Sequence, residues 1–148
     1  MIRKAMAAVL ACADSMDEHA AKLLQALPQW QMDEGLGATA NGLCAGLKDT
    51  AGRVMFEMAL LQAQVDEGKA DAESVVRTLS GMDAAMMEAL AAVPDVVERF
   101  ENAAERDEQN ERPFVLMIEA AGVMLQNLDR ARAATQSLRV QGSGLRRS

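Results

Sequence analysis

Apolar residues recur at intervals of three and four positions along most of the chain, which is the spacing of one face of an α-helix. The first such pattern covers residues 3–27 and predicts a helix that ends there, because Pro28 forces the preceding residue out of the α region. A second pattern is clear over residues 43–65. Residues 33–46 are rich in glycine, so this segment is predicted as either a loop or the start of a closely packed helix.

A third pattern covers residues 72–103 and keeps its phase through Pro94. Proline inside a helix removes one backbone hydrogen bond and clashes with the carbonyl four residues earlier, here that of Leu90. Because the phase is unbroken, the sequence predicts a single third helix with a kink at Pro94 rather than a long loop.

The fourth pattern begins beside Pro113, which suits the first turn of a helix, and continues to Leu138. Each predicted helix has one apolar stripe that needs neighbours, and helices of similar length with short links form antiparallel bundles. The prediction is an all-α, up-and-down four-helix bundle over residues 1–139. A flexible basic tail without periodicity is predicted for residues 140–148.

The composition supports this fold class and narrows the possible chemistry. The 148 residues suit one domain, and alanine with 11 methionines dominates the apolar half, while aromatic residues make up only 3%. Two cysteines and one histidine are too few for a disulfide framework, a closed zinc site or a di-iron site built from Glu-x-x-His pairs. We therefore expect no metal and no cofactor.

Charge is distributed unevenly along the chain. All 22 acidic residues lie at or before Asp129, whereas five arginines and no acidic residue follow it. An acidic body repels the phosphate backbone, so the sequence argues against nucleic-acid binding by the folded part. Such a surface favours a basic or amphipathic protein partner, or simply keeps the protein soluble.

The N-terminal segment has some features of an export signal. Two basic residues precede an apolar run at residues 5–13, and the sequence from Val9 to Cys12 is similar to a lipoprotein cleavage box. The run is at the short end for a signal and continues in helical phase into the following residues. No run approaches the length of a membrane span. We expect a cytoplasmic protein without a transmembrane span, with an exported or lipid-anchored helical protein as an alternative.

Two patterns of small residues lie in the glycine-rich segment. The string Gly35 to Ala40 matches G-x-G-x-x-A, but no strand precedes it, so it does not predict a nucleotide site. Ala38, Gly42 and Gly46 are four residues apart and would form a smooth strip on a helix. Close packing inside the bundle is the favoured interpretation, and a tight contact with a partner or a second copy is the alternative.

The one histidine suggests a second function. The segment from Asp17 to Lys22 places His19 outside the predicted core, with a lysine at the third position after it. This short pattern resembles helical-bundle phosphotransfer domains, although the glycine that usually follows the lysine is missing here. The resemblance implies that His19 accepts a phosphoryl group and that Lys22 offsets its charge. No nucleophile turn or oxyanion hole accompanies it, so no enzyme activity is expected.

Methionines cluster in the predicted second to fourth helices. The flexible thioether lets an apolar surface adapt to different partners, although a soft alanine and methionine core explains any single residue. The candidate partner-binding residues are Met58, Met82 and Met86, where the second and third helices would meet. The leading prediction is a non-catalytic intracellular interaction protein. It would be an adaptor or chaperone-like binder of amphipathic or basic helices that also self-associates as a homodimer.

Overall fold

Helices account for nearly all of the computed structural model, which describes residues 1–31 and 34–147, with side chains described as far as residue 141. Five α-helices and two short 3₁₀ turns follow one another, and the described residues contain no strand. The α-helices are α1 (Ile2–Ala26), α2 (Glu34–Asp66), α3 (Ala72–Leu90), α4 (Val93–Arg106) and α5 (Glu111–Arg147). The 3₁₀ turns are Leu27–Gln29 and Glu108–Asn110.

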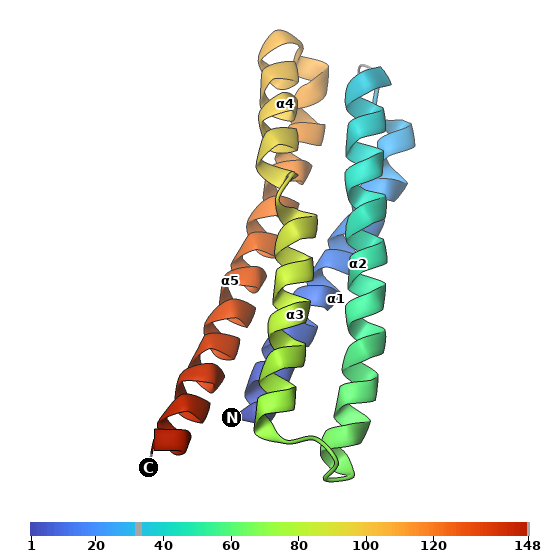
Figure 1. Ribbon diagram of the computed structural model, residues 1–148. Helices are drawn as coiled ribbons and strands as arrows, with labels where there is room; N and C mark the ends of the chain where they lie inside the picture. Colours follow the sequence, from blue (N-terminus) through green and yellow to red (C-terminus); the bar gives the residue numbers. More distant parts are fainter. Residues whose placement is uncertain (32–33, 148) are drawn as a thin grey trace.

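The five helices form four antiparallel rods, because α4 continues the direction of α3 (Figure 1). The chain runs up α1, down α2, up α3 and α4, and down α5 (Figure 1). α1 packs against both α2 and α5, while α3 contacts α2, α5 and α1. The predicted all-α, up-and-down four-helix bundle is confirmed.

The first two helices end where the sequence provides a stop. α1 ends at Ala26, and the 3₁₀ turn that follows carries Pro28 in its first turn, as predicted. α2 ends in a turn in which Gly68 has φ +71°, a conformation that suits glycine. The amides of Gly68 and Lys69 donate to the carbonyls of Val65 and Gln64 at 3.1 and 2.9 Å, which satisfies the last carbonyls of the helix.

The glycine-rich segment is helical, which decides between the two interpretations of residues 33–46. α2 begins at Glu34 and runs without interruption for 33 residues. The prediction at residue 33 itself lies outside the described residues.

A single third helix bent at Pro94 is not confirmed. α3 begins after Asp71, whose carboxylate accepts from the amide of Ser74 at 2.7 Å, and it ends at Leu90. A new helix, α4, begins three residues later at Val93 and holds Pro94 in its first turn. The break precedes the proline because Pro94 has no N–H to donate to the carbonyl of Leu90. The backbone of Ala91 stays in the right-handed helical region, so the apolar phase passes from one helix to the next.

The core is built from the apolar stripes of all five helices. Trp30, just after the first 3₁₀ turn, meets Phe100 of α4 edge to face, with ring centroids 6.2 Å apart. The largest fully buried side chains besides Phe100 are dominated by methionine and leucine: Met16, Leu47, Leu79, Met82, Met86, Leu90, Met117 and Met124. The aromatic-poor composition therefore produces the alanine, leucine and methionine core that the spacing predicted.

α5 begins with Pro113 in its first turn and extends to Arg147. The prediction of a flexible basic tail at residues 140–148 falls mostly on side chains outside the described part, and it stays a prediction. Among the described residues, no helix has an apolar stretch long enough to cross a membrane.

Candidate functional site

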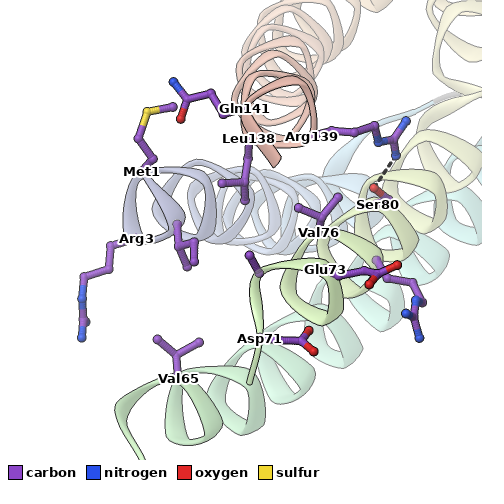
Figure 2. Close-up of a pocket in the computed structure, with 13 residues that line it drawn as sticks. Met1, Arg3, Val65, Asp71, Glu73, Val76, Ser80, Leu138, Arg139 and Gln141 are labelled. Carbon is purple, nitrogen blue, oxygen red and sulfur yellow. Dashed lines mark hydrogen bonds between the residues drawn. The ribbon is translucent and has the colours of Figure 1, made fainter. Parts of the chain in front are cut away.

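An open groove of about 1130 Å³ lies at the end of the bundle where α1 begins, between α3 and the last turns of α5 (Figure 2). Apolar side chains from several elements line the opening. Ile2 comes from α1, Val65 from the end of α2 and Val76 from α3, and these three are half-buried, whereas Leu138 of α5 is buried. The walls of this groove are mainly apolar.

Charged side chains border the groove and are held by local contacts. Arg3 pairs with Asp66 at 3.1 Å, and both side chains are exposed. Arg139 of α5 donates to the hydroxyl of Ser80 on α3, across the groove (Figure 2). Together with Arg77, the two arginines Arg3 and Arg139 give the lining three guanidinium groups against two carboxylates. The groove therefore lacks the acidic excess of the chain as a whole.

A buried polar cluster lies farther along the α3–α5 interface, next to Ser80 and Arg139. Asp83 and Thr135 are both buried, and neither Asp83 Oδ1 nor Thr135 Oγ1 has a hydrogen-bond partner. Burial raises the pKa of the Asp83 carboxyl, and the neighbouring Thr135 hydroxyl and the guanidinium of Arg132 offset only part of this rise. Nothing in the apolar spacing marked Asp83, because one carboxylate beside a helical stripe is common.

His19 lies on α1 at the edge of a second hollow, of about 680 Å³, between α1 and α5. Its Nδ1 is 2.8 Å from the carbonyl oxygen of Ser15. A carbonyl oxygen only accepts, so Nδ1 carries a proton, and Nε2 is the nitrogen that has a lone pair whenever the ring is neutral. Lys22 Nζ pairs with Glu18 at 3.1 Å on the exposed side of the helix. The structure thus places His19 as a half-buried residue with Lys22 one turn away on the same helix.

The same hollow is bordered by apolar side chains of α5. Leu116, Ile118 and Val123 line it and are exposed, although they carry no charge or hydrogen-bonding group. The apolar spacing of the sequence assigned α5 a single buried stripe and gave no signal for these exposed apolar residues.

The three methionines proposed to bind a partner lie inside the bundle. Met58, Met82 and Met86 are all buried in the core, and none of them lines a hollow described above. A partner could reach these thioethers only if the helices separated. Their role in binding stays a prediction, while the folded chain offers other surfaces to a partner.

The two cysteines are also core residues. Cys12 and Cys44 are free and buried. Burial raises the pKa of the Cys12 thiol to about 12, with a smaller contribution from Asp83, and it raises the pKa of Cys44 to about 11. Both thiols are therefore protonated at neutral pH and poor nucleophiles. The lipid-anchored alternative, which would modify Cys12, requires this side chain to leave the core.

Over the described residues, no three histidine, cysteine, aspartate or glutamate side chains come together as a metal site would require. No protein-family model, curated protein or solved structure matches the chain.

Proposed function

We propose that the protein is a non-catalytic interaction protein that binds an amphipathic helix of a partner protein in the groove between α1, α3 and α5. The observation that carries this proposal is the open, mainly apolar groove at the end of the bundle. An amphipathic helix supplies apolar side chains three and four residues apart, which is how helix-in-groove partners are held.

The walls and the rim of the groove make different contributions to binding. Ile2, Val76 and Leu138 would bury the apolar stripe of the incoming helix, which supplies most of the affinity. The guanidinium groups of Arg3 and Arg77 would face its polar side and favour carboxylates there. The rim also holds carboxylates, so it suits an amphipathic helix with both signs of charge on its polar side better than a strongly basic one.

Site-specific crosslinking in the native cell tests the groove. A photoreactive amino acid at Val76, inside the groove, is expected to capture a partner through a helical segment. The same amino acid at Glu105, exposed on α4 and away from the groove, serves as the control. The captured segment, made as a peptide, should bind the purified protein and lose affinity when Val76 becomes aspartate. If the crosslinked products at Val76 and Glu105 are the same, the groove is not the binding site.

A second candidate function is phosphoryl transfer through His19, and one observation favours it. The hydrogen bond of Nδ1 to the carbonyl of Ser15 leaves Nε2 as the nucleophilic nitrogen of a half-buried ring. The exposed apolar residues Leu116 and Ile118 beside it offer a contact area for a phosphodonor protein.

Incubation with a phosphorylated receiver domain separates the two candidates. Phosphoryl transfer predicts an acid-labile phosphate on the protein that disappears in His19→Gln, while the circular dichroism spectrum stays that of the folded bundle. A Lys22→Gln variant should slow the transfer without abolishing it, because the ammonium only offsets charge. If no phosphate appears with any donor while crosslinking at Val76 succeeds, the interaction function alone stands.

A further inference from the structure

The outer face of α2 carries large apolar side chains that no part of the described chain covers. Phe56 is 67% exposed and Leu60, one turn later, is 53% exposed. Both lie on the side of α2 opposite the buried residues Leu47 and Met58, so they contribute nothing to the core. Phe56 is also the most exposed large apolar side chain of the described part. Such a pair points to an external contact.

Towards its N-terminus the same face of α2 is smooth. Gly42 and Gly46 are exposed, and a Cβ added at either position would meet no atom within 4 Å. The interpretation that Ala38, Gly42 and Gly46 pack closely inside the bundle is therefore wrong, because the strip faces outwards. Glycine weakens a helix relative to alanine, and nothing within the described chain requires it here.

A pair of opposite charges separates the smooth half of this face from the apolar half. Asp49 and Arg53 lie one turn apart, and their side chains meet at 3.6 Å while remaining exposed. With 3.6 residues per turn, these two residues lie on the same narrow stripe as Gly42, Gly46, Phe56 and Leu60. The stripe therefore reads small, small, acidic, basic, large, large along the helix.

Two copies of this stripe are complementary to each other when their helices run in opposite directions. When two such helices run antiparallel about a twofold axis at the level of Ala51, Phe56 meets the partner's Gly46. In the same register Leu60 meets the partner's Gly42, and Arg53 meets the partner's Asp49. Each large side chain then faces a position without a side chain, and each charge faces its opposite, twice by symmetry.

We propose that a second copy of the chain docks on this outer face, α2 against α2 in antiparallel orientation, to form a homodimer. The glycines let the two backbones approach closely while the phenylalanine and leucine side chains fill the space above them. The Asp49 and Arg53 pairs fix the register, because sliding the helices by one turn brings like charges together. This surface lies on α2, away from the groove between α1, α3 and α5, so its test is independent of the proposed function.

Sedimentation equilibrium of the full chain over a range of concentrations tests the dimer. Wild type is expected to form a dimer, and Gly46→Leu is expected to weaken the association at least about ten-fold, because the added side chain occupies the place of the partner's Phe56. Gly81→Leu is the matched control, since Gly81 lies exposed on α3 with no atom near its Cβ. Leucine favours helix over glycine, so loss of the dimer in Gly46→Leu cannot come from unfolding. A wild-type protein that is monomeric throughout overturns the proposal.

Charge reversal tests the register. Arg53→Glu should weaken the dimer because two carboxylates then face each other across the axis, and the double variant Asp49→Arg with Arg53→Glu should restore it. The double variant also restores the ion pair within the helix, so its folding matches wild type. A dimer with the same affinity in wild type and Arg53→Glu places the interface elsewhere and overturns the proposal.

Disulfide trapping tests the orientation. Mixed Gly46→Cys and Phe56→Cys chains should crosslink to each other under mild oxidation, whereas either variant alone should not. The native cysteines do not interfere, because Cys12 and Cys44 are fully buried. Crosslinking of Gly46→Cys to itself would show parallel helices and overturn the antiparallel arrangement.

Discussion

Replacement of Asp83 by asparagine is expected to stabilise the bundle at neutral pH. Asp83 lies on α3 with only 8% of its surface exposed, and its Oδ1 accepts no hydrogen bond. Thr135 Oγ1, on α5 beside it, is buried without a partner as well. An asparagine amide is neutral, so the substitution removes the cost of burying a charge, and its Nδ2 can donate to Thr135 Oγ1 in place of the attraction between the hydroxyl and the carboxylate.

The expected gain in the free energy of unfolding follows from the cost of burying the Asp83 carboxylate. Burying a carboxylate in place of a neutral side chain costs at least as much as burying a polar group without a hydrogen bond, about 1–3 kcal/mol, so the free energy of unfolding should rise by about that amount at pH 7. Arg132 and Arg139 attract the carboxylate, but both arginines are exposed. Losing these two attractions in Asp83→Asn therefore costs little stability. For a chain of this length, each kcal/mol raises the melting temperature by about 2–4 °C.

The gain should depend on pH. Burial raises the pKa of Asp83 in the folded state above its value in the unfolded chain. The protonated carboxyl therefore favours the folded state, and wild type loses this stability as the pH rises through the raised pKa. Below the unfolded pKa of about 4 the carboxyl is neutral in both the folded and the unfolded state, so burial of the charge no longer destabilises wild type. The difference between Asp83→Asn and wild type should thus be largest at neutral pH and shrink on acidification.

Thermal and urea unfolding at neutral and mildly acidic pH measures both effects. Asp14→Asn, at an exposed position of α1, is the matched control and should leave stability nearly unchanged. Lower stability of Asp83→Asn than of wild type at neutral pH would refute the reasoning. An equal gain at both pH values would show that the charge of Asp83 is not its source.

Four further outcomes follow from the core, the helix break and the groove. Met86→Ala should lower the free energy of unfolding by about 2–5 kcal/mol in urea titrations, whereas Met86→Leu should cost less than about 1.5 kcal/mol, because the first leaves a cavity. Pro94→Ala should change stability by less than about 1 kcal/mol, since Pro94 lies in the first turn of α4, a position that accommodates proline and alanine alike. Cys12 and Cys44 should react with a thiol reagent at mildly alkaline pH only after denaturant is added, because burial keeps both thiols protonated. Affinity for a groove-binding peptide should fall only modestly with added salt in calorimetry, because apolar contacts are not screened.

Much of the fold could be predicted because each helix has an apolar stripe of constant phase. The last residue of α1 and the first residue of α3 were also predictable. Pro28 stops α1 and the carboxylate of Asp71 caps the start of α3, and both effects are local. The start of α2 was not, because glycine propensity favours a loop, while burial of Leu36 and Ala40 favours a helix. Burial of these side chains is a tertiary effect that no local rule supplies.

The helix break before Pro94 and the candidate site could not be predicted from apolar spacing either. A kink at Pro94 and a break before it preserve the same apolar phase, so spacing could not distinguish them. Likewise, the periodicity that identified Met58 and Met86 as apolar stripe residues does not say whether the stripe is covered. The groove depends on where the ends of α1, α3 and α5 lie relative to one another, which the sequence does not encode in any short motif.

The charge of the whole chain does not decide what its surfaces bind. The chain carries a net charge of −7, yet the lining of the groove holds more arginines than carboxylates. On the outer face of α2, one acidic and one basic residue balance each other. Net charge acts over distance and is screened by salt within about 10 Å, whereas docked surfaces depend on the few groups that they bury. The net charge therefore sets only the long-range field of the protein, and the local pattern of each face would determine which of the proposed partners binds there.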